Sequence, residues 1–401
     1  MDLKVEIPSA FSGVVELPAS KSITARALIV NALMGGNAPL LNVAKCDDAN
    51  VMLAALTSHD NIINVGAAGT AMRFLTAYFA SCEGRTVVLD GTVRMRERPV
   101  GVLVDALRQM GAEIEYLSHE GFPPLKITGK RLHGIDLAMR GNVSSQFASA
   151  LLMVAPLAGG LHLTLEGEIV SKPYIDMTIG IMRHYGIDAR WIGNTIVVQA
   201  GQYVHAPLAI EGDWSAASYW FALQALLPQS AIKLKPLLRH SLQGDSAIID
   251  MMAPLGVVAT WHVKELVLSN VPVTMPRHYC RDMAATPDLV PTLAVTLCLL
   301  RVPFILTGVG NLRIKESDRL EALGCELAKL GYSIEVGQGS LSYNGNHCEP
   351  SGKVTIDPHD DHRLAMSLSL AATRHCGITI KNAEAVSKSY PTFWQSLMPI
   401  N

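Results

Sequence analysis

The segment SSQFASALLMVAPLAGG, residues 144–160, is the best guide to the fold, because it recurs along the chain in the same general form. Each copy opens with small polar or charged residues, continues as a nearly all-apolar run rich in Ala, Leu and Met, and often ends near Gly. A helix that is apolar on every side must be buried. The other copies are KSITARALIVNALMGG (21–36), GTAMRFLTAYFASCEG (69–84), DWSAASYWFALQALL (213–227), DLVPTLAVTLCLL (288–300) and DHRLAMSLSLAAT (361–373).

A second kind of helix alternates with the buried ones and is amphipathic. In each of its four copies a Gly follows where the helix should end, and a short β-rich run comes next. These copies begin at Val100, Ile175, Ser246 and Asp318. The repeating unit is therefore predicted as strand, surface helix, strand, strand, buried helix.

The spacing of the apolar copies predicts the domains. Their starts lie 48, 75, 69, 75 and 73 residues apart, a regularity that argues against chance, and the six units fall into two groups of three. We expect one domain over residues 1–19 plus 213–401 and a second over 20–212. The first strand, Leu3 to Ile7, is expected to close the domain of the C-terminal half. The short first spacing indicates a strand pair and helix segment lost between Asn61 and Val65.

The composition excludes several classes of protein. Hydrophobic residues make up 49% and charged residues 17% of the 401, which rules out a disordered or fibrous chain. The net charge of −2 argues against a general nucleic-acid binder. Seven scattered cysteines without a CxxC indicate neither a disulfide framework nor a zinc site. With no signal-peptide pattern and no apolar run of membrane length, we expect a cytoplasmic enzyme without membrane or nucleic-acid partners.

The starts of the buried helices predict an anion site. Helix N-termini offer N–H donors and a partial positive charge, and six of them converging on one cleft would bind anions. Each nearby cation taken alone could be an ordinary surface residue, but as a group they favour a cleft for phosphate and carboxylate. These cations are Lys21, Arg26, Arg73, Arg94, Arg96, Arg98, Lys315, Arg319, Arg363 and Lys388.

Eight motifs in order resemble the 5-enolpyruvylshikimate-3-phosphate synthase family, from about Leu17 to Pro391. They are LPASKSITARAL, GAAGTAMR, RMRERPVG, NVSSQF, SKPYID, RIKESDRL, DDHRLAM and SKSYP. The resemblance implies an α/β fold of two similar domains, each of three βαβαββ units with pseudo-three-fold symmetry, and an active site in the interdomain cleft. It implies enolpyruvyl transfer from phosphoenolpyruvate to the 5-hydroxyl of shikimate 3-phosphate, with release of phosphate, through a tetrahedral intermediate. The pathway implied is aromatic amino-acid biosynthesis, without metal or organic cofactor; we expect a monomer whose partners are the two substrates.

The resemblance assigns proton transfer to three residues. Asp288 is implied to face the 5-hydroxyl and the methyl group, although its place at a helix start alone favours a simple N-cap. Glu316 is implied to act near the methylene carbon, with an ion-paired surface Glu as the alternative. Lys21 is implied to share phosphate binding and proton transfer, with a solvated Lys as the alternative.

The same resemblance gives two sets of binding residues. For shikimate 3-phosphate they are Ser22, Arg26, Ser144, Ser145, Gln146, Ser171, Tyr174, Asp288, Asn311 and Lys315. For phosphoenolpyruvate they are Lys21, Gly69, Arg94, Gln146, Arg319, Arg363 and Lys388. Arg26 can hold a carboxylate through two parallel bonds, whereas helix capping by Ser144 and Ser145, packing by Tyr174 and a plain turn at Gly69 remain open. His362 is expected to be structural.

Three positions depart from the family pattern. Ala67 and Ala25 stand where Asn is usual, and Phe74 stands where Pro is usual. We therefore expect the affinity for phosphoenolpyruvate to differ from that of family members with the usual residues. Glyphosate is expected to compete with phosphoenolpyruvate, and a methyl group added at Gly69 is expected to intrude on that site.

The sequence disfavours two alternative functions. UDP-N-acetylglucosamine enolpyruvyl transferase shares fold and chemistry, but uses a loop Cys that TVRMRERPVG (92–101) lacks. A non-catalytic, anion-binding relative is disfavoured because all three proton-transfer residues are present.

Overall fold

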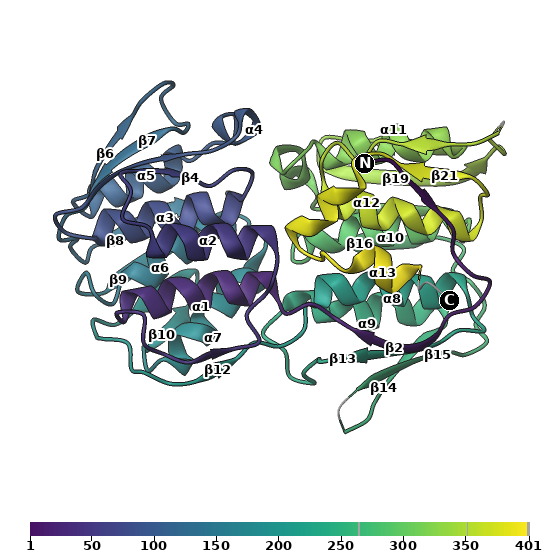
Figure 1. Ribbon diagram of the computed structural model, residues 1–401, viewed down its shortest axis with the longest axis horizontal. Coiled ribbons are helices and arrows are strands. Elements are labelled where there is room, and N and C mark those ends of the chain that lie inside the picture. The colour runs from purple at the N-terminus through teal and green to yellow at the C-terminus, as the bar shows by residue number, and fades with distance from the viewer. Residues whose placement is uncertain (264, 351, 399–401) are drawn as a thin grey trace. The chain divides into compact units, whose positions relative to one another are not determined.

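The chain forms two compact units. The computed structural model describes residues 1–263, 265–350 and 352–398. Unit 1 contains Met1–Ala19 and Glu211–Asn401, and unit 2 contains Ser20–Ile210. Figure 1 shows that each unit is built of helices and several separate small sheets.

The second crossing between the units lies two residues earlier than expected. The sequence placed Glu211 and Gly212 with residues 20–212, but both pack in unit 1. Gly212 N donates to Pro236 O at 2.8 Å, and Glu211 accepts from Ser241 Oγ at 2.6 Å. These bonds to unit 1 residues explain the shift.

Each complete repeat builds one four-stranded mixed sheet. A strand, a buried helix and a parallel strand are followed by a surface helix and a hairpin that returns antiparallel, as in β4-β5-β7-β6. The elements of this repeat are β4 (Ile62–Asn64), α3 (Gly69–Ser81), β5 (Thr86–Asp90), α5 (Gly101–Gln109), β6 (Glu113–Tyr116) and β7 (Leu125–Thr128). This order is the βαβαββ unit.

Three further sheets have the same strand order and the same parallel first pair. Unit 2 holds β8 (Asp136–Arg140), β9 (Leu161–Glu166), β11 (Thr195–Val198) and β10 (Ala189–Ile192). Unit 1 holds β2 (Ser12–Glu16), β13 (Ala231–Lys235), β15 (Leu266–Asn270) and β14 (Val257–Trp261), and also β16 (Tyr279–Asp282), β17 (Phe304–Thr307), β19 (Ser340–His347) and β18 (Tyr332–Val336).

The remaining repeat of unit 2 is incomplete. Its strands β12 (Leu208–Ala209) and β3 (Leu40–Leu41) pair only with each other among the described strands. The surface helix α2 (Asp47–Thr57) is present, and only a short turn separates it from β4. The sequence predicted that a strand pair and a helix segment are lost between Asn61 and Val65, and this prediction is wrong in place and extent. That segment forms β4, and what is missing is a hairpin after Thr57.

The remaining repeat of unit 1 is completed by the N-terminus. Strand β20 (Thr355–Ile356) runs parallel to β21 (Ile378–Ile380), and β1 (Leu3–Val5) pairs antiparallel with β21. The expectation that the first strand closes the C-terminal half is confirmed.

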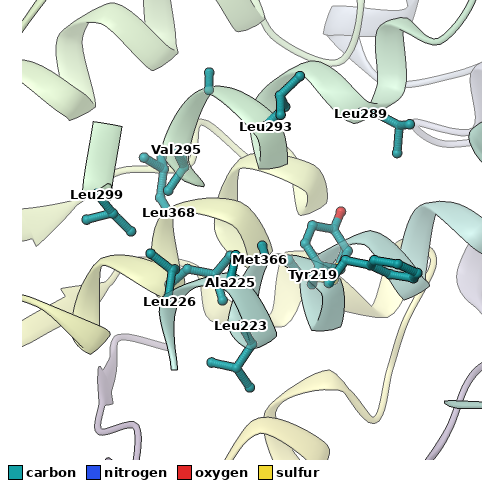
Figure 2. Close-up of a cluster of buried hydrophobic side chains, with 14 of the residues drawn as sticks. Tyr219, Leu223, Ala225, Leu226, Leu289, Leu293, Val295, Leu299, Met366 and Leu368 are labelled. Atoms are coloured by element: carbon teal, nitrogen blue, oxygen red, sulfur yellow. The ribbon is translucent and has the colours of Figure 1, made fainter. Parts of the chain in front are cut away.

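All six apolar copies form buried helices. They are α1 (Lys21–Leu33), α3 and α6 (Ser145–Val154) in unit 2, and α8 (Trp214–Leu226), α10 (Val290–Leu299) and α12 (His362–Ser369) in unit 1. Every residue of α8 is buried. Figure 2 shows Leu223 of α8, Leu293 of α10 and Leu368 of α12 in one apolar cluster. Hydroxyls join the same helices, because Thr292 Oγ1 lies 3.2 Å from both Ser218 Oγ and Ser367 Oγ.

The surface helices lie over the buried ones. For example, α7 (Lys172–His184) contacts both α1 and α6. The helix expected from Ser246 is broken, because Pro254 stops the α-helix and the segment becomes η1 (Gly244–Ala247), α9 (Ile248–Met252) and η2 (Ala253–Leu255). Within the described residues, none of the helices combines the length and apolarity that a membrane crossing requires.

The other helical segments are short, apart from α11. They are α4 (Val93–Arg96), η3 (Pro287–Leu289), η4 (Gly310–Ile314), α11 (Arg319–Lys329), η5 (Leu370–Thr373), η6 (Ala383–Lys388) and α13 (Phe393–Leu397). Of these, α4, η3, η4, α11 and η6 carry predicted site residues.

Candidate active site

Arg319 is the centre of an ion cluster in unit 1. It is the first residue of α11, whose N-terminus Asp318 caps, and it is 1% exposed. Its Nη1 donates to Asp288 Oδ1 at 3.0 Å, its Nη2 to Glu316 Oε2 at 2.9 Å, and its Nε to Asp361 Oδ2 at 2.7 Å. Burial alone would lower the pKa of Arg319, but these three carboxylates raise it, so the guanidinium stays charged.

Asp288 is held by cations and does not act as the N-cap. It lies inside η3, before α10, and the N-cap position belongs to Thr286. Besides Arg319, it accepts from Arg363 Nη2 at 2.7 Å and lies 3.9 Å from Lys315 Nζ. Burial works to raise the pKa of Asp288, but Arg363, Lys315 and Arg319 hold it well below its ordinary value. The carboxylate is therefore ionised at neutral pH.

Glu316 lies between two cations of the same cluster. Besides Arg319, its Oε1 is 3.2 Å from Lys388 Nζ at the end of η6. Both Glu316 and Lys388 are largely buried, at 14% and 10% side-chain exposure. The alternative of an exposed surface Glu is excluded by this burial.

Two acidic residues near this cluster were missed by the sequence reasoning. Asp361 is fully buried, caps α12 through Arg363 N at 2.9 Å, and binds Arg319. Asp245 is 3% exposed and hydrogen-bonds Ser215 Oγ. Burial, with a contribution from the nearby Asp288, raises the pKa of Asp245 to about 7. In the sequence, only the acidic start of DDHR and the QGD triplet could have indicated Asp361 and Asp245.

Lys21 of unit 2 also has a partner that the sequence did not suggest. It is the first residue of α1, which Ser20 caps, and its Nζ lies 2.9 Å from Asp48 Oδ2. With side-chain exposures of 13% and 9%, neither residue is a solvated surface group. Asp48 therefore fixes the position of the Lys21 ammonium.

Arg26 is used within unit 2 more fully than expected. It is 2% exposed, and its Nη1 donates to Ser22 O at 2.9 Å. Its Nη2 donates to Ser149 Oγ at 3.2 Å and to Tyr174 O at 3.0 Å, and its Nε to Thr178 Oγ1 at 2.7 Å. Burial lowers its pKa to about 10, which still leaves it charged. In this arrangement Arg26 hydrogen-bonds to the backbone of the predicted ligands Ser22 and Tyr174, and it does not present two parallel N–H bonds to a carboxylate.

The other predicted residues of unit 2 gather at helix starts. Ser144 caps α6 through Gln146 N at 3.3 Å, which supports the capping interpretation, and Ser145 is the first helical residue. Gln146 Nε2 donates to Thr70 Oγ1 at 3.0 Å, so α6 and α3 begin side by side. Ser171 is 4% exposed and precedes α7 in a left-handed conformation, with φ of 55°.

Gly69, Arg94 and Asn311 have different surroundings. Gly69 begins α3 and is not a turn glycine. Arg94 is 44% exposed and pairs with Glu97 at 3.1 Å. In unit 1, Asn311 in η4 has a buried Oδ1 without a hydrogen-bond partner. His362, expected to be structural, is 1% exposed on α12.

The structure thus brings together six of the predicted residues in unit 1. Asp288, Lys315, Glu316, Arg319, Arg363 and Lys388 form one connected network with Asp361. In unit 2 the predicted residues form two hydrogen-bonded groups, one around Arg26 and one joining α6 to α3. A network of cations that encloses ionised carboxylates can bind anions and move protons.

Comparisons with known proteins agree with this chemistry. A family model described as EPSP synthase (3-phosphoshikimate 1-carboxyvinyltransferase) matches residues 5–58 and 55–397. A 3-phosphoshikimate 1-carboxyvinyltransferase of Bacteroides fragilis (strain YCH46) is 46% identical over 393 residues, which covers 97% of this chain and 95% of the relative. The protein of the same description from Vibrio atlanticus (strain LGP32) is 38% identical over 422 residues, covering 96% of each.

Solved structures share the fold. An EPSP synthase structure from Acinetobacter baumannii matches with a TM-score of 0.74 and 22% identity, over 98% of this chain and 96% of that one. The enolpyruvyl transferase NikO from Streptomyces tendae matches with a TM-score of 0.73 and 17% identity, with the same coverage. By its sequence match over nearly its whole length, this chain belongs to the EPSP synthase (3-phosphoshikimate 1-carboxyvinyltransferase) family.

Proposed function

We propose that Asp288, Glu316 and Lys21 move the protons in the reaction of this enzyme. The reaction transfers the enolpyruvyl group of phosphoenolpyruvate to the 5-hydroxyl of shikimate 3-phosphate and releases phosphate, in the shikimate pathway to the aromatic amino acids. The observation that carries the proposal is the cluster around Arg319, in which two carboxylates from different elements are held close together by four cations. Addition followed by elimination needs an acid and a base beside bound anions.

Asp288 takes the proton of the attacking 5-hydroxyl in this proposal. In the ligand-free enzyme, its low pKa makes it a weak base, because Arg363, Lys315 and Arg319 stabilise its charge. An anionic substrate competes for the same cations and adds negative charge nearby. Both effects raise the pKa of Asp288 toward the range of a useful base, so substrate binding itself activates the carboxylate.

Glu316 and Lys21 serve the methylene carbon and the departing phosphate. Glu316 stays within reach of Lys388 and Arg319, so proton transfer at its carboxyl changes the charge felt by a phosphate bound to those cations. Lys21, oriented by Asp48, can give a proton to the phosphate as it leaves. Each role requires the group to contact substrate, which substitution can test.

The binding residues are assigned within each unit. For phosphoenolpyruvate we assign Arg319, Arg363 and Lys388 in unit 1, and Lys21, Gly69, Arg94 and Gln146 in unit 2. For shikimate 3-phosphate we assign Asp288, Asn311 and Lys315 in unit 1, and Ser22, Arg26, Ser144, Ser145, Gln146, Ser171 and Tyr174 in unit 2. The unpartnered Oδ1 of Asn311 supports its assignment, since a sugar-like hydroxyl would satisfy it.

We also propose that the enzyme is a cytoplasmic monomer whose partners are these two substrates. Six of its cysteines, Cys82, Cys280, Cys298, Cys325, Cys348 and Cys376, are free thiols. Reduced thiols are typical of a reducing compartment.

A phosphate-release assay with both substrates tests the proposal. Release should require both compounds, and omission of shikimate 3-phosphate should abolish it. Glu316→Gln should slow solvent deuterium entry into the methyl group of the intermediate, whereas Glu335→Gln, at an exposed position of β18, should not. Wild-type deuterium entry in the Glu316 variant would remove that residue from the proton path.

A further inference from the structure

Asp245 is a buried carboxyl group that the reaction as described so far does not use. It lies in η1, between β13 and α9, and is 3% exposed. Its Oδ2 accepts a hydrogen bond from Ser215 Oγ in the first turn of α8. Its Oδ1 is also buried and has no hydrogen-bond partner. A charged carboxylate with a buried, unsatisfied oxygen is costly, so this position needs a reason.

Gln243 holds the segment of Asp245 against the start of α8. The Gln243 side chain accepts from Trp214 N at 3.0 Å and donates to Gly212 O at 2.8 Å. On the other side, the backbone N of Ser246 donates to Gln243 O at 3.1 Å. The position of Asp245 is therefore fixed relative to the first turn of α8.

The start of α8 also lies against the segment that carries Asp288. Helix α8 contacts both η1 and η3, and Ser218 Oγ of α8 lies 3.2 Å from Thr292 Oγ1 of α10, the helix that continues from η3. Asp245 and Asp288 are close enough for their negative charges to repel each other. The two carboxyl groups therefore influence each other, although different helical segments carry them.

The immediate partners of the two carboxyl groups differ in charge. Asp288 accepts hydrogen bonds from the guanidinium groups of Arg319 and Arg363. Asp245 accepts from the neutral hydroxyl of Ser215. Surroundings that separate two neighbouring titratable groups in this way give the two groups different roles in proton transfer.

Charged groups of several elements face the carboxyl group of Asp245. Burial raises its pKa most, and repulsion by Asp288 of η3 raises it next. Arg363 of α12 and the hydrogen bond from Ser215 lower the pKa, while Asp213, the N-cap of α8, raises it. Because the resulting pKa is about 7, Asp245 is mostly neutral below pH 7 and mostly ionised above it.

We propose that Asp245 controls the strength of Asp288 as a base, through the negative charge that Asp245 carries once it is ionised. The proposal rests on the proposed function, in which Asp288 takes the proton of the 5-hydroxyl. A second negative charge nearby makes Asp288 hold a proton more readily. Asp245 acts through Asp288 and is therefore a positioning residue.

The pH dependence of turnover in Asp245→Asn tests the proposal. Asn imitates the neutral form of Asp245 at every pH. The ratio of wild-type to variant kcat should be close to one at about pH 5.5 and should rise to about threefold to tenfold at about pH 8.5, because a stronger base accelerates proton transfer. The ratio cancels the titration of the substrates' own phosphate groups. The KM for either substrate should change less than about threefold.

Two further variants serve as a probe and a control. Ser215→Ala removes the hydrogen bond that favours ionised Asp245, so the rise in kcat should move to higher pH by about half a unit to one unit. A purely structural effect of Ser215→Ala would instead lower kcat equally at every pH. Asp250→Asn, at an exposed position of α9, the helix that follows η1, should keep the wild-type profile.

The Asp288→Asn background tests whether Asp245 acts through Asp288. In that background, Asp245→Asn should change kcat less than about twofold at about pH 8.5, and full additivity would overturn the proposal. A wild-type to variant ratio that is the same at every pH would show that Asp245 has only a structural role. A ratio that is largest at low pH would show that the neutral form assists the reaction, which would also overturn the proposal.

The failure of this inference can be told apart from the failure of the proposed function. Near-normal turnover of Asp288→Asn would refute the proposed role of Asp288 as the base. A flat ratio for Asp245→Asn, together with strongly reduced turnover of Asp288→Asn, would refute only the role of Asp245.

Discussion

Asp288→Asn is the substitution that best separates catalysis from binding. Asn has the shape of Asp, but its neutral amide cannot take a proton from the 5-hydroxyl. Turnover should fall roughly 10²–10⁴-fold, the range for loss of one general base. Binding of phosphoenolpyruvate should be unchanged or tighter, because Arg319 and Arg363 lose a competing carboxylate.

The cost to stability follows from the contacts of Asp288. Its two oxygens accept from Arg319 at 3.0 Å and Arg363 at 2.7 Å. Asn can keep one acceptor, while its NH₂ must face the other guanidinium. One charge-assisted bond is weakened and one is lost, so the free energy of unfolding should fall by about 2–4 kcal/mol.

The stability difference should depend on pH in a defined direction. The folded pKa of Asp288 lies below the ordinary value of 3.8. Its ion pairs therefore contribute stability that is fully present above that pH and is lost as the pH falls further below it. The difference in the free energy of unfolding between the wild type and Asp288→Asn should therefore become smaller in acid.

Three measurements check these statements, namely kcat, direct substrate titration and urea unfolding at pH 7 and below pH 4. Asp250→Asn, on the exposed face of α9, is the matched control. Near-normal turnover of Asp288→Asn would refute the assignment and pass the base role to Lys21 or Glu316. Reduced turnover with equally reduced affinity would mean that Asp288 acts in binding alone and not as the base.

Three further substitutions give distinct outcomes. Asp245→Asn should stabilise the protein by a few kcal/mol at pH 8 but not below pH 4. The pKa of Asp245 is about 7 in the folded protein against an ordinary value of 3.8, so the stability of the wild type falls as the pH rises from 3.8 to 7. Urea unfolding at pH 8 and below pH 4 tests this. Asp48→Asn should tighten phosphate binding about twofold to fivefold in titrations by freeing Lys21, and an unchanged Kd would place Lys21 away from the anion. Burial lowers the pKa of His375, so wild-type stability should drop as the pH falls below 6.5, and His375→Gln should flatten that slope in unfolding experiments.

The repeat made most of the fold predictable. Runs such as 213–227 contain too few polar residues for a surface helix, so burial of α8 follows from composition alone. The regular spacing then implied the surrounding strands. The missing hairpin after Thr57 was harder to place, because the short strand β4 has no distinctive pattern and could be taken for the gap.

The partners within the site were beyond sequence reasoning. Arg319 reaches Asp288 across 31 positions, and Arg363 reaches the same carboxylate across 75. Motifs identified these residues singly, but only the packing of η3, α11 and α12 shows that they share one cluster. Asp361 was missed because an acidic residue before a helix has an ordinary capping role, which it also fills.

The pseudo-symmetry of the two units gives Phe74 a meaning that the motif comparison could not. In unit 1, the hydroxyls that join the three central helices lie at the sixth residue of an apolar copy or next to it. At the same places unit 2 has Arg26, Phe74 and Ser149, with the Arg26 guanidinium 5.2 Å from the centre of the Phe74 ring and hydrogen-bonded to Ser149. Phe74 is therefore part of the packing that holds Arg26, and through it Ser22 and Tyr174. A departure that the sequence linked to phosphoenolpyruvate acts, by its contacts, on the residues assigned to shikimate 3-phosphate.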